Sequence, residues 1–190
     1  MACLRAANQA PSGGNIQPWQ FLVVTDADTR AAIGELYRRA YYRYEAALLA
    51  VRPPARDAED EASFQRTLDA SRHLADHLGE APALVLFLMP DVDLTLTDDE
   101  GPLDIGTTYA SVYPAVQNFM LAARSRGLGT VLTTVYRIHH DELRDIVDVP
   151  DRFQVVALVP VGHPAGRFGR ARRRPVEAVT HWNRFGDKRR

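Results

Sequence analysis

Four hydrophobic runs along the chain have the pattern of β-strands. Residues 21–25 (FLVVT) form a compact β-rich run, and residues 83–89 (ALVLFLM) are apolar throughout between two prolines. A continuous apolar run of this length is typical of a strand covered on both faces. Residues 130–136 and 154–161 are predicted as two further strands.

The clearest helical spacing begins at Tyr109 and predicts a central buried helix that ends at Gly127. Its apolar positions are Tyr109, Val112, Tyr113, Val116, Phe119, Met120 and Ala123. Residues 29–49, 64–78 and 140–147 are predicted as three more helices, the first with Asp26 as its N-cap. Strands and helices mix without strict βαβ repetition, which favours an α+β fold with a central sheet covered by helices.

The last part of the chain, residues 165–190, is too polar to form a core of its own. It nevertheless carries four apolar anchors, which are Val176, Val179, Trp182 and Phe185. Apolar side chains in such a stretch indicate that the tail packs against something, such as a second subunit.

The composition is that of one globular domain. The chain has 190 residues, 46% of them hydrophobic and 25% charged, with a net charge of −1. A chain of this length can bury a sizeable core as a single domain. Residues 163–190 alone carry nine basic and two acidic residues, a net charge of +7, which leaves −8 for the rest. The Arg-rich run at 170–174 could bind a phosphate, while the acidic remainder and the lack of a recognition module disfavour nucleic acid.

Cysteine usage and hydropathy indicate a cytoplasmic protein. The one cysteine, Cys3, excludes an internal disulfide framework and a cysteine-based zinc site. No apolar run is long enough to span a bilayer, and the first residues lack the order of a signal peptide. We therefore expect no membrane association.

Residues 10–19 (APSGGNIQPW) are the first candidate binding segment. Two glycines allow the backbone to approach a ligand closely, and Ser12 and Asn15 offer short polar groups. An ordinary turn is the alternative, because Pro, Ser, Gly and Asn are the usual turn residues.

Residues 127–134 (GLGTVLTT) are the second candidate, since a predicted strand there ends in two hydroxyl groups. A plain β-branched strand is the alternative. His73 and His77 have helical i,i+4 spacing and could share a metal ion, but two surface histidines are the simpler interpretation. The Rossmann, P-loop and α/β-hydrolase signatures are absent.

Several segments, taken together and in order, resemble the FMN-dependent nitroreductase family, and most closely its actinobacterial branch. They cover most of the chain apart from residues 35–80. They are APSGGNIQPWQFLVV (10–24), EAPALVLFLMP (80–90), YPAVQNFMLAARSRGLGTVLTT (113–134), VVALVPVGHP (155–164) and RRRPVEAVTHWNRFG (172–186). The resemblance implies a three-layer α-β-α sandwich with a central mixed, mainly antiparallel sheet. It also implies one domain over residues 1–190 and a homodimer that exchanges its C-terminal tails, with two FMN sites at the interface.

The resemblance also assigns site residues. The ribityl chain and the ring edge of FMN would be contacted by Pro11, Ser12, Gly13 and Asn15, and the ring would be lined by Leu132, Thr133 and Thr134. Arg173 would pair with the phosphate. Relatives carry a preceding Arg-Arg-Ser-x-Arg-like segment on the phosphate, and this sequence begins beyond it. Either Arg172 and Arg174 compensate for that segment, or Met1 is a misplaced start.

The activity implied by the resemblance is oxidoreduction. NADPH or NADH would reduce the flavin, and a small planar electron-poor acceptor such as a nitroaromatic or a quinone would then take its place. Because the flavin carries the chemistry, no residue is expected to be catalytic and no metal is needed. Residues 36–72, where the resemblance is poorest, are expected to form a lid. The alternative is a non-enzymatic flavin-binding or sequestering protein, or a member with impaired FMN binding.

Overall fold

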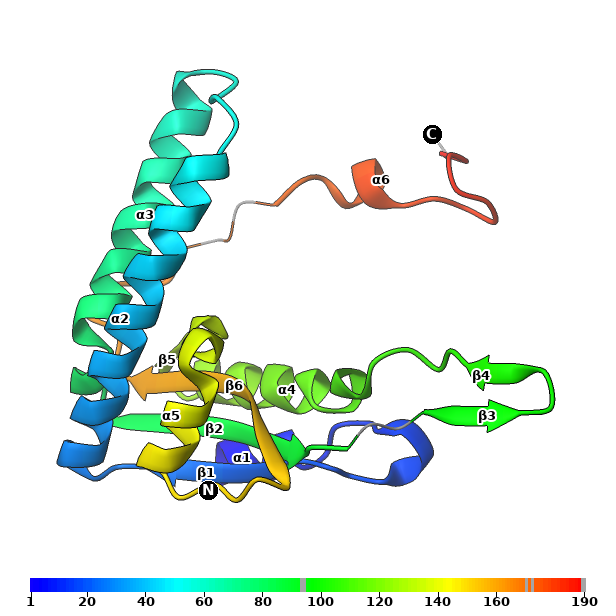
Figure 1. The fold of residues 1–190 in the computed structure, drawn as a ribbon. Coiled ribbons are helices and arrows are strands. Elements are labelled where there is room, and N and C mark those ends of the chain that lie inside the picture. The colour runs from blue at the N-terminus through cyan, green and yellow to red at the C-terminus, as the bar shows by residue number, and fades with distance from the viewer. Residues whose placement is uncertain (93–94, 170, 172, 189–190) are drawn as a thin grey trace.

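A computed structural model describes residues 1–92, 95–169, 171 and 173–188, and shows three layers around one sheet (Figure 1). The sheet has the order β1-β2-β6-β5, and every pairing in it is antiparallel. Its strands are β1 (Gln20–Val24), β2 (Ala83–Pro90), β5 (Gly129–Thr130) and β6 (Phe153–Gly162). The predicted α+β class and the three-layer sandwich are confirmed.

The two faces of the sheet carry two separate cores because side chains alternate along β2. Leu84 and Leu86 face the helices α2 (Ala27–Val51) and α5 (His140–Ile146). Val85 and Phe87 face the opposite layer, formed by α1 (Ala2–Ala7) and α4 (Tyr113–Arg124). The prediction that residues 83–89 form a strand covered on both faces is therefore confirmed.

The predicted helices are present; α5 begins at the predicted residue, and the other three begin elsewhere. The side chain of Asp26 accepts a hydrogen bond of 2.8 Å from Thr29 N, so it is the N-cap of α2. Helix α3 (Ala58–His77) begins earlier than expected. The stripe that begins at Tyr109 falls first on a 3₁₀ turn, η3 (Thr108–Ser111), and only then on α4.

The strand expected over residues 130–136 is wrong. Strand β5 stops at Thr130, and Thr133 makes one isolated bridge to Leu158 of β6. The chain then turns into a 3₁₀ helix, η4 (Val135–His139). Tyr136 explains the turn, because its ring is fully buried and its hydroxyl donates a hydrogen bond of 2.9 Å to Val155 O. β-branched content does not reveal such a tertiary anchor.

The structure also contains short elements that the pattern did not predict. A hairpin of β3 (Leu96–Asp98) and β4 (Gly101–Leu103) projects from the body between β2 and α4 (Figure 1). Two further 3₁₀ turns are η1 (Gly13–Asn15) and η2 (Leu78–Glu80), and the tail holds a short helix, α6 (Val176–Val179).

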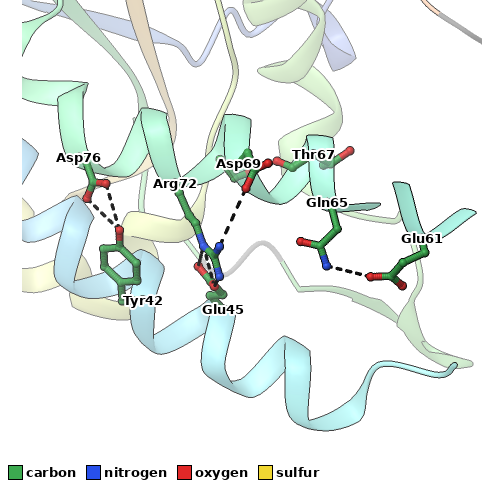
Figure 2. Close-up of polar contacts among 9 residues, drawn as sticks. Tyr42, Glu45, Glu61, Gln65, Thr67, Asp69, Arg72 and Asp76 are labelled. Carbon is green, nitrogen blue, oxygen red and sulfur yellow. Dashed lines mark hydrogen bonds and ion pairs between the residues drawn. The ribbon is translucent and has the colours of Figure 1, made fainter. Parts of the chain in front are cut away.

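Helices α2 and α3 form a long antiparallel arm that extends beyond the sheet (Figure 1). The arm is connected across its length by polar contacts, among them the ion pair of Arg72 with the buried Glu45 and the hydrogen bond of 2.9 Å from Tyr42 Oη to Asp76 (Figure 2). The predicted lid falls largely on this arm. None of the described helices is both long and apolar enough to cross a membrane.

Candidate functional site

A hydrogen bond joins the two ends of the loop between α1 and β1. Asn8 Oδ1 accepts a hydrogen bond of 2.8 Å from Nε1 of the buried Trp19. Between them Gly14, Asn15 and Gln17 have φ values of +56°, +55° and +46°. Left-handed backbone is unfavourable for the two residues that are not glycine, and such strain is found mainly at functional sites.

Hydrogen bonds hold this strained loop in one conformation. Gln17 N donates to Ser12 Oγ at 3.0 Å, and Gln17 Nε2 donates to Asn15 Oδ1 at 3.0 Å. Gly13 N donates to Ser111 Oγ at 3.2 Å, which ties the loop to the segment that precedes α4. The loop is therefore a braced cradle whose shape depends on a distant part of the chain.

A cleft of about 670 Å³ opens beside the cradle, which is a usual size for a small-molecule site. It is lined by Pro11, Ser12, Gly13, Ile16, Pro18, Met89, Pro90, Val92, Ile105, Gly106, Thr107, Thr108, Ala110, Ser111 and Pro114. The walls are mainly apolar, with hydroxyl groups from the cradle and from residues 107–111. None of these lining residues carries a charge.

The lining of this cleft does not include Leu132, Thr133 or Thr134. Thr133 lies beside β6, and Leu132 packs against the core layer that contains Met89. Thr133 exchanges two backbone hydrogen bonds with Leu158, of 3.0 and 3.1 Å. Its side chain is buried, and its Oγ1 lies 3.0 Å from Tyr37 Oη. Burial raises the pKa of Tyr37, so the phenol stays neutral. The Thr133 hydroxyl is therefore hydrogen-bonded within the core of its own chain. Its neighbours Leu132 and Thr134 are half-buried.

Arg173 is exposed in the tail, which leaves the body after β6 (Figure 1). Arg174 is exposed as well, and Arg172 lies outside the described residues. Pro11, Ser12 and Gly13 thus line one cleft, with Asn15 in the same cradle. Within one chain the structure does not bring this group together with residues 132–134 or with Arg173.

Sequence reasoning missed the wall of the cleft formed by residues 105–111. Ser111 supplies the acceptor for Gly13 N, and Thr107 Oγ1 accepts a hydrogen bond of 3.3 Å from Tyr109 N at the start of η3. Gly106 has φ +75°. The available signal was the Gly-Thr-Thr turn just before the helical stripe.

The two histidines of α3 lie close together. The ring centroids of His73 and His77 are 4.5 Å apart, and His77 Nδ1 is 2.9 Å from Glu80 Oε1. Among the residues that the structure describes, no group of three or more His, Cys, Asp or Glu side chains could hold a metal ion.

Comparisons with known proteins agree with the fold. The profile of the Nitroreductase family matches residues 1–163. Iodotyrosine deiodinase of Thermotoga neapolitana is 31% identical over 162 residues, covering 85% of this chain and 74% of that protein. Nitrobenzene nitroreductase of Ectopseudomonas oleovorans is 30% identical over 168 residues, covering 84% and 74%. The crystal structure of oxidized iodotyrosine deiodinase bound to FMN and 3-iodo-L-tyrosine aligns with a TM-score of 0.71 at 27% identity, covering 97% of this chain and 86% of that one. By sequence and by fold, this chain belongs to the Nitroreductase family.

Proposed function

We propose that this protein is an FMN-dependent oxidoreductase that uses NAD(P)H to reduce a planar electron-poor acceptor such as a nitroaromatic or a quinone. The observation that carries the proposal is the uncharged cleft beside the braced cradle of residues 11–17. The family assignment and the FMN-bound relative support it.

The cleft fits a flavin ring in size and in chemistry. An isoalloxazine has an apolar dimethylbenzene end and a polar edge of nitrogen and oxygen atoms. The cleft offers apolar walls such as Met89 and Ile105, and the hydroxyl groups of Ser12 and Ser111. When bound, FMN would supply the redox chemistry, and the chain would supply orientation and exclusion of water.

The ribityl phosphate needs a cation that the cleft lining does not contain. Arg173 is the residue of the tail that we assign to this role, through a forked, charge-assisted hydrogen bond. Leu132 and Thr134 would form a second wall against the ring. Because these groups lie apart within one chain, we place them in a homodimer with exchanged tails, where each site takes the cradle from one copy and Arg173 from the other.

The first test is the visible absorption spectrum of the protein supplied with FMN and then desalted. We expect a retained flavin band that bleaches on anaerobic addition of NADPH or NADH and returns when nitrobenzene or benzoquinone is added. A retained band that neither nucleotide bleaches would contradict the enzymatic proposal and favour a flavin-binding protein. No retained flavin would contradict the FMN site itself.

A second candidate acceptor is a halogenated phenol. It is favoured by the relatives named iodotyrosine deiodinase, one at 31% sequence identity and one at a TM-score of 0.71. Adding 3-iodo-L-tyrosine to the reduced protein and measuring released iodide separates the two acceptor classes. Iodide release with slow nitrobenzene turnover would replace the first acceptor with the second.

A further inference from the structure

The β3–β4 hairpin projects from the body of the chain (Figure 1). Its two strands pair with each other, and neither makes substantial contacts with another helix or strand of the described residues. A two-stranded hairpin alone is marginally stable in water. Its ordered form therefore calls for a partner that covers it.

The hairpin presents an apolar pair with an acidic border. Leu96 and Leu103 lie opposite each other on its two strands, and both are exposed. Val92 and Ile105 at the base are exposed as well, but they line the cleft and belong to the proposed flavin site. Residues 91–104 contain six acidic residues and no basic one. At the turn, Asp98, Asp99 and Glu100 take part in none of the ion pairs found within the described residues.

The C-terminal tail has the opposite character. Residues 163–190 carry a net charge of +7. Val176 is 65% exposed, and Phe185 is 93% exposed. Phe168 near the start of the tail contacts Arg124 of α4, but the later part that carries α6 runs clear of the layers of its own chain (Figure 1). Val176 and Phe185 belong to neither core.

We propose that the β3–β4 hairpin of one copy is the docking surface for the C-terminal tail of a second copy. This inference rests on the homodimer of the proposed function. An apolar, acidic surface and an apolar, basic tail complement each other in both properties, and two-fold symmetry makes the contact twice. Docking would also explain why both segments keep large apolar side chains exposed in the single chain.

The sequence makes this contact easy to map, because Lys188 is the one lysine in the chain. A carbodiimide joins a carboxylate to a primary amine only when the two touch, and the chain offers no amines besides Lys188 Nζ and its N-terminus. Dimers would be assembled from equal amounts of ¹⁴N- and ¹⁵N-labelled protein, cross-linked and digested. We expect Lys188 joined to the 91–104 segment in isotopically mixed peptide pairs, less at high ionic strength.

Cross-links from Lys188 to the hairpin of the same copy only, or to other segments only, would overturn the proposal. A protein that is monomeric in solution would overturn it as well. Lys188→Arg is the control, because it keeps the charge and must abolish the cross-link.

Charge variants give a second, independent measurement. The double variant Asp99→Asn, Glu100→Gln should raise the dimer dissociation constant about threefold to tenfold, because it removes weak, exposed ion pairs at both symmetric contacts. The control variant Asp28→Asn, Asp145→Asn makes the same charge change on exposed residues outside the hairpin. It should leave the dimer dissociation constant unchanged. Equal effects of the two pairs would overturn the docking. FMN retention by the unaltered chain is measured separately, and its loss would contradict the proposed function rather than the docking.

Discussion

Thr133 and Thr134 are adjacent in sequence, but their surroundings differ. Thr133 Oγ1 is hydrogen-bonded to Tyr37 in the core, so Thr133→Val leaves a buried phenol without a partner. We expect this change to lower the free energy of unfolding by about 1–3 kcal/mol, as urea denaturation would measure. The rate of flavin reduction in the folded protein should stay the same.

Thr134→Val tests the other hydroxyl. Thr134 is half-buried beside the bridge between Thr133 and Leu158, where we place the wall of the flavin ring. We expect little change in stability and an altered rate of flavin bleaching by NADPH in stopped-flow absorption. If both variants slow bleaching equally, or if neither does, this division of roles is wrong.

Asn15 tests the cradle, because its φ of +55° is a conformation that only glycine adopts freely. Asn15→Ala loses the hydrogen bond from Gln17 and keeps an unfavourable Cβ. We expect it to cost about 1–2 kcal/mol of stability and to weaken FMN binding in a fluorescence titration. Asn15→Gly removes the same hydrogen bond without the steric cost, so it should retain more stability than alanine. A reversed order would show that the backbone is not strained here.

At the residue scale, the sequence predicted the cradle but not its support. Pro, Ser, Gly and Asn at residues 11–15 mark a polar turn wherever they occur, and the resemblance placed it in the site. The local pattern could not predict the role of Ser111, because its Oγ accepts a hydrogen bond from Gly13 N, 98 positions away in the chain. Such a partner is fixed by the docking of two loops, which no local pattern encodes.

Among the elements, the α2–α3 arm depends on an ion pair between its helices. Hydrogen bonds from the Arg72 guanidinium hold the pKa of the buried Glu45 below its ordinary value (Figure 2). Since the folded pKa is lowered, this stabilisation is present above the ordinary pKa of glutamate and is lost as pH falls through the folded value. Arg72→Gln should lower the free energy of unfolding at neutral pH, because it leaves the buried carboxylate of Glu45 without its partner. The difference from the unaltered protein should disappear in acid, as denaturation across pH would show.

The base of the same arm depends on two glycines in contact. A Cβ built on Gly34 of α2 would lie 2.8 Å from Gly79 N, and backbone cannot move aside cheaply. Alanine in a helix gains about 1 kcal/mol over glycine, but the clash should outweigh it. We expect Gly34→Ala to lower the free energy of unfolding by about 1–3 kcal/mol. Gly166→Ala, whose Cβ would meet nothing within 4 Å, is the control.

The sequence predicted best the elements whose own apolar pattern indicates which faces are buried. Strand β2 is apolar throughout, and α4 has an unbroken helical stripe. The strand over residues 130–136 failed because Tyr136 turns inward to bond Val155, an event outside the local pattern. The β3–β4 hairpin escaped notice because its acidic turn lacks the alternation of a half-buried strand.

For the whole molecule, the predicted site falls into two parts. The cradle lines an uncharged cleft, while Thr134 and Arg173 lie outside that lining. A composite site across two copies accounts for this separation, and the exposed apolar tail is consistent with exchange. The resemblance to the family named the residues of both parts. Periodicity and composition could not show that Thr134 and Arg173 lie outside the cleft that the cradle lines.

Complementation between two inactive variants tests this composite site. Gly13→Leu would fill the cleft beside the cradle, and Arg173→Glu would repel the phosphate, so each variant alone should fail to retain FMN. If each site takes its cradle from one copy and Arg173 from the other, a mixed dimer has one doubly altered site and one unaltered site. Random assembly makes about half of the dimers mixed, so about a quarter of all sites should regain the flavin band. If both residues served a site within one copy, every site would keep one defect, and mixing would restore nothing.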